Sequence, residues 1–287
     1  MIYKILNYVS LDRGLIKALE NLDKKQQSKA LRLSKKLSKG NANCLSKKEP
    51  MIKLAASLKS AEKTLSIYKK YGISEDIFRS TFDDIRIWCE NFDNKGLDNI
   101  GWIKNHINFK LFKIGRLQFQ FFKCRSRYLD FSKQPFSRGE KVINIHIPQG
   151  EKLNIDECKK SLCKANEFFK EYFHQFKYGY YFCESWLLCE NNRKFMDENS
   201  NIVKFMNLFD IRCNIPYEKQ TFERIFGIDM NSKSPIFGND EEKRKAEISC
   251  LSENTSLQRS AKSYLLDGGR FGMGIGIIDK DKCVGNG

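Results

Sequence analysis

A histidine among isoleucines is the first residue of this sequence whose chemistry stands out. The segment Val142–Pro148, VINIHIP, has the pattern of a strand, in which Asn144 and His146 share one face. The isoleucines on the other face predict burial, whereas the Asn144 face could line a cleft. Imidazole titrates near neutral pH, which makes His146 a candidate general base and Asn144 a candidate substrate-binding residue. A hydrogen-bonded structural histidine is the alternative.

The loop after this strand leads directly into a predicted helix that runs from Ile155 to about Tyr172. Asn154 and Glu157 have the spacing of a capping box, which fixes the start of that helix. Free N–H groups at a helix start attract phosphate, although Glu151 opposes an anion. The candidate phosphate-binding residues of this segment are Gln149, Gly150, Lys152 and Asn154.

A second predicted strand, FCESWLL from Phe182 to Leu188, carries a thiol, a carboxylate and a hydroxyl. Cys183 is a candidate nucleophile, but no histidine adjoins it in the sequence, and a buried inert thiol is the alternative. Glu184 could act as a base or pair with a lysine or arginine. Ser185 shares the Cys183 face, so it is a candidate substrate contact.

Two arginines lie at positions that are unfavourable for a positive charge unless a partner is present. Arg116 and Gln118 share one face of an otherwise apolar strand, GRLQF, so they form either a structural network or a clamp for a substrate carboxylate. Arg259 lies in the first turn of a predicted helix capped by Thr255 or Ser256, where a cation opposes the helix dipole. That position indicates an anionic neighbour, and we count all three side chains as candidate substrate contacts.

Other chemistry is excluded by spacing. Ten cysteines and three histidines are scattered without the spacing of a zinc module, so no metal site is predicted, and the cysteines are expected to be reduced. The segment GGRFGMGIG has the glycines of a phosphate loop, but it follows a predicted helix instead of a strand. We interpret it as a final strand whose glycines allow close packing.

The elements that must position these residues fall into two parts. Residues 1–108 carry amphipathic patterns and stop signals such as Gly72, which predict a helical N-terminal domain. Residues 109–287 alternate strands with helices, beginning with a strand in LFKIGRLQFQFFKCR. This alternation predicts an α+β (α/β) domain with a mixed sheet flanked by helices and at least one parallel pair of strands.

Composition and charge limit the class of protein. The 287 residues have a globular composition, with no apolar run near the roughly 20 residues of a membrane span and no signal peptide, so a cytoplasmic protein is expected. The net charge is +16, and residues 1–70 hold 17 lysines and arginines against 5 acidic residues. This basic region is either a solvated surface or a binding surface for an anionic cosubstrate, an acidic carrier protein or nucleic acid.

Several segments, taken in order, resemble a known family. They cover roughly Ile52 to Ile278 and include GISEDIFRSTFDDIRIW, LFKIGRLQFQF, INIHIPQGEKL, FCESWLL, SNIVKF and TSLQRSAKSYLLDGGRFGMGIGII. The chain resembles bacterial acyltransferase-domain proteins, which pair a helical N-terminal acyltransferase domain with a C-terminal domain related to the GNAT superfamily. The resemblance implies a sheet in which two adjacent parallel strands separate to admit an acyl thioester, with its pyrophosphate on the loop after the first strand.

The implied activity is an acyltransferase, and most directly an N-acyltransferase. An amine or hydroxyl of a small molecule or peptide would attack the thioester of acyl-CoA or of an acyl carrier protein in one ternary complex. The donor would be a cosubstrate, with no tightly bound cofactor, and His146 would be the base, with Glu184 second. Because the loop has a single glycine, Gly150, where the family's typical loop has two positions for small residues, an acidic carrier protein is included as a partner. The alternative is an inactive GNAT-like protein that binds nucleic acid or an acidic partner through its basic N-terminal region.

Overall fold

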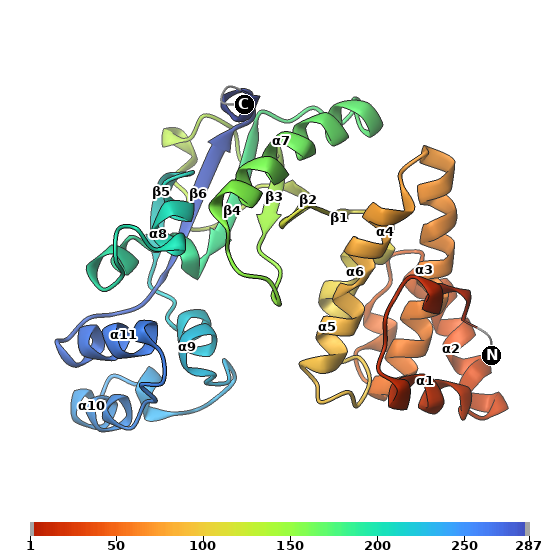
Figure 1. The fold of residues 1–287 in the computed structure, drawn as a ribbon, viewed down its shortest axis with the longest axis horizontal. Coiled ribbons are helices and arrows are strands. Elements are labelled where there is room, and N and C mark those ends of the chain that lie inside the picture. The colour runs from red at the N-terminus through yellow and green to blue at the C-terminus, as the bar shows by residue number, and fades with distance from the viewer. Residues whose placement is uncertain (1–2, 285–287) are drawn as a thin grey trace. The chain divides into compact units, whose positions relative to one another are not determined.

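A computed structural model describes residues 3–284 of the chain (Figure 1). The chain forms two compact units, and each is described by itself. The first unit contains the residues up to Phe121 together with Ile145–Lys152 and Lys160–Phe176, and the second contains Phe122–Asn144, Leu153–Lys159 and the residues from Lys177 onward. None of the helices in the described part of the chain is long and apolar enough to cross a membrane.

Six α-helices make up most of the first unit, as the helical N-terminal prediction required. They are α1 Arg13–Glu20, α2 Lys24–Leu37, α3 Pro50–Tyr71, α4 Glu75–Phe82, α5 Asp84–Glu90 and α6 Ile100–Ile107. Helix α3 is the centre of the unit, because eleven of its side chains are buried, including Ala55, Ala56 and Ser60, which let α2 approach closely. It ends at Gly72, whose φ of 71° is the left-handed conformation that glycine adopts most easily.

The apolar residues of SEDIFRSTFDDIRIWCENF share one stripe, which predicts a single helix that begins at Ser74, but the segment forms two helices. Ser74 caps α4 as expected, but α4 ends at Phe82 and α5 begins at Asp84. At the break the two adjacent carboxylates diverge: Asp83 pairs with Arg86 at 2.7 Å near the surface, whereas Asp84 is buried. A helical stripe alone does not reveal this separation, because both helices contribute apolar residues to the same core.

The predicted strand in LFKIGRLQFQFFKCR is a hairpin. Strand β1, Leu111–Ile114, pairs in antiparallel fashion with β2, Leu117–Lys123, through a turn at Gly115 and Arg116. Gly115 has a φ of 63°, and a Cβ atom there would lie 2.6 Å from the Oγ of Ser161, so the turn requires glycine on both counts. The same Ser161 hydroxyl donates to the Ile114 carbonyl at 2.6 Å and fixes the turn that presents Arg116.

The strands form one mixed six-stranded sheet in the order β1-β2-β3-β4-β6-β5. The remaining strands are β3 Lys141–His146, β4 Tyr180–Ser185, β5 Asp210–Ile215 and β6 Met273–Asp279. Strand β6 is antiparallel to both of its neighbours, whereas β3 and β4 are parallel, with Ile143 opposite Tyr181 and Asn144 opposite Phe182. The α+β class and the parallel pair are therefore confirmed.

Helices and short turns of 3-10 helix connect these strands. Helix α7, Ile155–Tyr172, follows β3 with the predicted bounds, and α8, Asn201–Met206, begins after Ser200, whose side chain accepts from the Val203 N–H. The 3-10 turns span Lys4–Asn7, Asn43–Leu45, Phe131–Lys133, Trp186–Leu188, Glu190–Lys194, Pro235–Phe237 and Lys280–Val284.

The core of the second unit lies around β6. Phe182, Val142, Ile275 and Ile277 are buried together in it. The glycines of β6 allow the close packing that the sequence indicated: a Cβ atom on Gly274 would lie 2.0 Å from the Leu188 carbonyl oxygen, and one on Gly276 would lie 2.8 Å from the Cβ of Phe209. The predicted glycine-interrupted final strand is confirmed.

Three further helices of the second unit lie side by side and enclose a small core of their own (Figure 1). They are α9 Lys219–Phe226, α10 Glu241–Ser249 and α11 Ser256–Leu266. The carboxylate of Glu218 joins them, because it accepts from the buried Arg244 at 2.9 Å and from the Phe271 N–H at 3.0 Å. Helices α9 and α10 were not predicted, since α10 buries only Arg244 and Ile248 and so has no apolar stripe.

Candidate active site

The His146 ring is hydrogen-bonded to Gln120, which also belongs to the first unit. Its Nε2 lies 2.8 Å from the amide oxygen Oε1 of Gln120, on β2. A carbonyl oxygen can only accept, so Nε2 carries the hydrogen and Nδ1 keeps the lone pair of the neutral ring. His146 therefore has its basic nitrogen at Nδ1.

A buried polar cluster lies next to this histidine. The Oδ2 atom of Asp84 accepts three hydrogen bonds, from Trp102 Nε1 at 2.8 Å, His106 Nε2 at 2.9 Å and Gln118 Nε2 at 2.8 Å. Burial by itself raises the pKa of Asp84, but His106 and the other two donors outweigh it, and the pKa lies below the ordinary aspartate value. Asp84 is thus a carboxylate that stays charged inside the protein.

Trp102 connects the cluster to His146. Its indole ring meets the His146 ring edge to face, with ring centroids 4.8 Å apart and an interplanar angle of 81°. The imidazole retains some accessible surface, yet the protein around it removes enough solvent to lower its pKa to about 4, with His106 acting in the same direction and Asp84 against it. His146 is therefore neutral at physiological pH, and Asp84 favours the imidazolium that forms when the ring takes up a proton.

Side chains of the first unit form hydrogen bonds with the predicted phosphate-binding loop. The guanidinium of Arg116 donates to the carbonyls of Lys152, Pro148 and Glu151 at 3.0, 3.1 and 2.8 Å. Gln149 accepts from Asn91 at 2.8 Å. Gly150 has a φ of 93°, with open space around the position that a Cβ would occupy. Arg116 thus orders this loop, which corresponds to the structural-network interpretation of Arg116 and Gln118 and not to a clamp for a substrate carboxylate.

The start of α7 is capped as predicted. The Asn154 side chain accepts from the N–H groups of Asp156 at 2.9 Å and Glu157 at 3.1 Å. These are two of the four N–H groups that a helix start leaves without a partner inside the helix. Asn154 therefore has a structural role as the cap, and its contact with a phosphate stays a prediction.

The second unit contains the other predicted residues of the parallel strands. Cys183 is completely buried, and burial, with Glu184 second, raises the pKa of its thiol far above the usual range. A thiol in this setting is protonated at neutral pH, so the structure favours the buried inert thiol over the nucleophile. Glu184 is exposed, and partial desolvation raises its pKa while Arg127 lowers it. Glu184 remains a candidate base, whereas Cys183 does not meet the requirement for a nucleophile.

The three remaining predicted substrate contacts also have structural partners or positions. Ser185 is buried and its hydroxyl accepts from the Leu187 N–H at 3.2 Å, which starts the turn after β4. Arg259 donates to the Glu253 carbonyl at 2.9 Å at the start of α11. Asn144 differs, because its Oδ1 is buried and contacts no hydrogen-bond donor among residues 3–284. Of these three, Asn144 alone presents an unused polar atom, as a substrate-binding residue would.

Four residues of this site were not singled out in the sequence: Asp84, Trp102, His106 and Gln120. Asp84 and Trp102 lie in short amphipathic helices, where polar and aromatic residues usually need no special explanation. Gln120 was the best signal available, because it continues the Arg116 and Gln118 face of an apolar strand. The cluster forms only when residues 84, 102, 106, 118 and 120 are brought together by folding.

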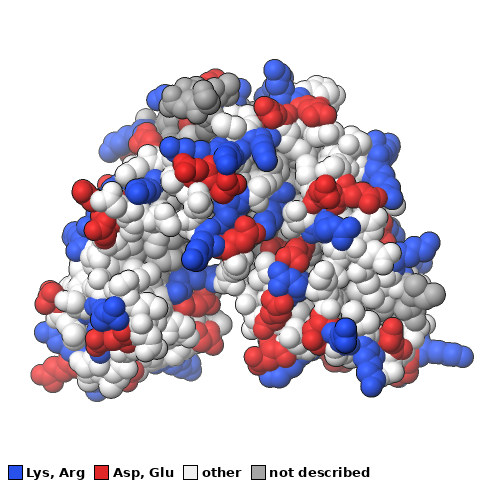
Figure 2. Space-filling view, viewed as in Figure 1, with Lys and Arg blue, Asp and Glu red and all other residues white. Residues whose placement is uncertain are grey.

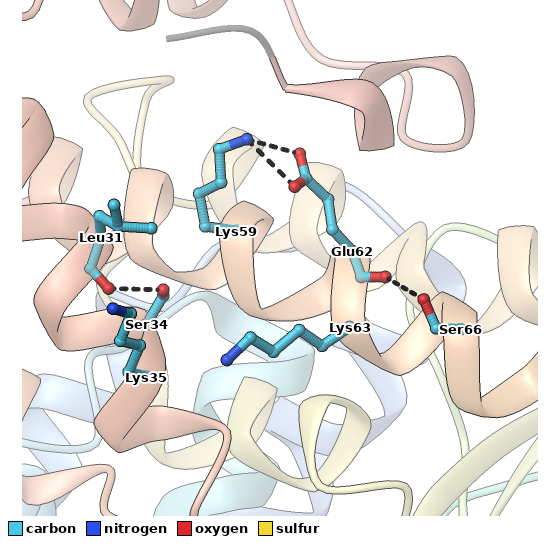
Figure 3. Close-up of a pocket in the computed structure, with 7 residues that line it drawn as sticks. All are labelled: Leu31, Ser34, Lys35, Lys59, Glu62, Lys63 and Ser66. Carbon is cyan, nitrogen blue, oxygen red and sulfur yellow. Dashed lines mark hydrogen bonds and ion pairs between the residues drawn. The ribbon is translucent and has the colours of Figure 1, made fainter.

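A separate hollow lies between α2 and α3 in the first unit (Figure 3). It has a volume of about 380 Å³ and is lined by Leu31, Ser34, Lys35, Lys59, Glu62, Lys63 and Ser66. The single carboxylate, Glu62, accepts from Lys59 at 2.9 and 3.0 Å. Lys35 and Lys63 form no ion pair with any residue in the described range 3–284, so the hollow is basic.

The described residues hold no cluster of metal ligands, and charges are mixed at the surface. Among residues 3–284 no group of three or more histidine, cysteine, aspartate or glutamate side chains is arranged to hold a metal ion, and the nine described cysteines form no disulfide. On the face shown in Figure 2, basic and acidic side chains are interspersed and do not form a single basic patch.

Fold and sequence now define the class of protein. Residues 111–278 match the model of the GNAT-like C-terminal domain, and residues 11–109 match that of the N-acyltransferase N-terminal domain. The chain therefore belongs to the family with a GNAT-like C-terminal domain, as the ordered segments indicated. No curated protein has significant sequence similarity to it.

Solved structures that resemble this chain include acyltransferases. One acyltransferase in complex with decanoyl-CoA and teicoplanin superposes with a TM-score of 0.73 at 15% identity, covering 96% of this chain and 86% of that chain. Another, in complex with CoA and 10C-teicoplanin, has a TM-score of 0.62 at 17% identity, covering 96% and 82%. At this level of identity the likeness shows a shared fold.

Proposed function

We propose that this protein transfers an acyl group from acyl-CoA to an amine or hydroxyl acceptor by direct attack in a ternary complex. The observation that carries the proposal is the hydrogen bond between His146 Nε2 and Gln120, which leaves Nδ1 as a proton acceptor. Family membership supports acyl transfer as the reaction class. An amine is the preferred acceptor, since the N-terminal match is to an N-acyltransferase domain.

In this reaction the acceptor nitrogen or oxygen attacks the thioester carbon and forms a tetrahedral oxyanion. Nδ1 of His146 takes the proton that the acceptor loses, and the CoA thiolate then leaves as the carbonyl re-forms. Asp84 stabilises the imidazolium electrostatically. Glu184 is the second candidate base, because its pKa is raised toward neutrality by desolvation.

The loop from Gln149 to Lys152 is the proposed contact for the phosphates of the donor. The loop offers backbone N–H groups and the Lys152 ammonium. Solved structures similar to this chain include complexes with decanoyl-CoA and CoA. A carrier-protein thioester is retained as an alternative donor. Residues 1–108 are proposed to help choose the acceptor, in addition to the role of Asp84, and residues 109–287 to bind the donor and provide the base.

The test is a panel of acyl-CoA and acyl carrier protein donors offered with amine and hydroxyl acceptors. Mass spectrometry should detect thioester loss matched by an acylated acceptor, and the matched control is His146→Gln. Binding without turnover by any donor and acceptor pair would contradict the proposal.

A second candidate function rests on the basic hollow of Figure 3. An inactive GNAT-like protein could bind an acidic partner there, through the unpaired ammonium groups of Lys35 and Lys63. Lys35→Gln with Lys63→Gln would then weaken binding of an acidic carrier protein or nucleic acid and reduce its salt dependence. The matched control, Lys24→Gln with Lys25→Gln, removes the same charge from α2 outside the hollow.

A further inference from the structure

The loop from Pro148 to Lys152 is held from one side by a single buried residue. Arg116 is 5% exposed, and its three donor positions, Nε, Nη1 and Nη2, all bond carbonyls of this loop. The Gly115 turn that presents Arg116 is itself fixed by Ser161. A planar guanidinium bonded to three carbonyls allows the loop little freedom to change conformation.

The direction of these carbonyls determines the direction of the amides. All peptide bonds in the described chain are trans, and a trans peptide directs its N–H opposite to its C=O. Since the carbonyls of Pro148 and Glu151 point toward Arg116, the N–H groups of Gln149 and Lys152 point away from it. Neither N–H has an acceptor among residues 3–284. The loop therefore presents free donors on the side opposite Arg116, as a phosphate-binding loop does.

The charge that should oppose an anion here is neutralised. Glu151 extends from the same loop, but its carboxylate lies 2.6 Å from the Nζ of Lys113 on β1. The Lys113 side chain is 12% exposed and that of Glu151 52% exposed, so a mostly buried ammonium lies against a carboxylate that still contacts solvent. With Glu151 paired, the charges of Lys152 and Arg116 favour an anion at the loop.

We propose that Arg116 and Lys113 are positioning residues for the phosphates of the acyl donor. Arg116 fixes the loop with its N–H groups turned outward, and Lys113 removes the repulsion of Glu151. Together the two side chains hold the loop backbone in place and pair its one acidic charge. The inference rests on the proposed function, because it takes a phosphate-bearing thioester as the donor.

The first experiment compares two ligands that differ in phosphate. Dissociation constants are measured by calorimetry for acyl-CoA and for S-acyl-pantetheine, which has the thioester arm without any phosphate. Arg116→Met should weaken the binding of acyl-CoA by about tenfold, through loss of the charge-assisted hydrogen bonds that hold the loop. It should leave the binding of S-acyl-pantetheine unchanged. The control Arg79→Met removes an arginine that also donates to a backbone carbonyl, that of Asn7, outside the loop.

A second set of variants keeps the test decisive if Arg116→Met does not fold. Lys113→Met frees the Glu151 carboxylate, so it should weaken the binding of acyl-CoA but not that of S-acyl-pantetheine. Lys113→Met combined with Glu151→Gln removes the freed charge and should restore the affinity for acyl-CoA. A general loss of structure would not be rescued in this way. Arg116→Lys keeps the charge but cannot bond three carbonyls, so its affinity for acyl-CoA should lie between those of the wild type and Arg116→Met.

The outcomes separate this inference from the proposed function. If the wild type prefers acyl-CoA to S-acyl-pantetheine and the Arg116 and Lys113 variants keep that preference, the inference is wrong and acyl transfer from CoA stands. If the wild type shows no such preference but turns over either donor, the loop binds no phosphate and the inference is wrong. If the wild type neither binds nor turns over any thioester, the proposed function fails, and the inference fails with it.

Discussion

Gln120 and His146 are joined by a hydrogen bond of 2.8 Å that fixes which nitrogen of the imidazole can accept a proton. Gln120 is on β2 and His146 at the end of β3, so the bond depends on how the strands are placed in the first unit. Behind the histidine, Trp102 meets its ring and donates to the charged Asp84. These contacts are the basis of the first four predictions.

His146→Gln should fold, bind the acyl donor normally and lose kcat by about 10²–10⁴-fold, the usual contribution of a general base. In the wild type, kcat/KM should fall on the acid side as pH drops through about 4, since burial lowers the pKa of His146 to that value and protonation removes the base. The variant should lack this acid limb. If His146→Gln keeps the wild-type kcat, another residue is the base, and Glu184 is the next candidate. If the variant does not fold, His146 is a structural histidine.

Gln120→Glu should move the acid limb toward neutral pH. A carboxylate 2.8 Å from Nε2 would stabilise the imidazolium and raise the pKa of His146. The control is Gln120→Leu, which removes the acceptor without adding charge, so it should lower kcat through loss of the fixed tautomer and leave the limb below neutral pH. Identical pH profiles for Gln120→Glu and wild type would show that the two side chains are not bonded in solution.

Asp84→Asn should destabilise the protein by about 3–5 kcal/mol, because three buried donors lose their common carboxylate. The neighbouring Asp83 is the matched control: it forms a half-exposed pair with Arg86, so Asp83→Asn should cost about 1 kcal/mol or less. Urea unfolding at neutral pH measures both. Equal effects of the two substitutions would contradict the buried cluster.

The stability that Asp84 contributes should depend on pH in one direction. Its pKa in the folded protein lies below the ordinary value, so its contribution is complete above the unfolded pKa of about 3.9 and is lost as pH falls through the folded pKa. The difference in unfolding free energy between wild type and Asp84→Asn should therefore be constant from neutral pH down to about pH 5 and shrink below about pH 4. A difference that grows on acidification would mean that Asp84 is protonated in the folded state.

Gly274→Ala should destabilise the second unit by about 1–3 kcal/mol or more, since its methyl group would overlap the Leu188 carbonyl oxygen at 2.0 Å. Gly179→Ala is the control, because a Cβ there meets no atom within 4 Å, and its cost should stay within about 0.5 kcal/mol. Thermal unfolding of both variants makes the comparison. A neutral Gly274→Ala would show that β6 does not pack against the turn after β4 in this way.

The features that the sequence determined by itself are those that depend on neighbouring residues. Helix α7 has its predicted bounds and its Asn154 cap, α3 stops at Gly72, and β6 is a glycine-interrupted strand. Caps, helix stops and strand alternation act over a few residues, so they can be read directly from the chain. The ordered segments also gave the family, which the matches over residues 11–109 and 111–278 confirm.

The tertiary structure alone decided which polar residues work together. Nothing in the sequence distinguishes Asp84 from Asp83, yet folding buries one beneath Trp102, His106 and Gln118 and leaves the other half-exposed beside Arg86. Arg116 could have faced a substrate or a loop, and the Gly115 turn, held by Ser161, directs it to the loop. Burial likewise makes Cys183 inert and lowers the pKa of His146. These properties depend on desolvation and on partners 18 to 47 residues away along the chain, which only the folded backbone brings within hydrogen-bonding distance.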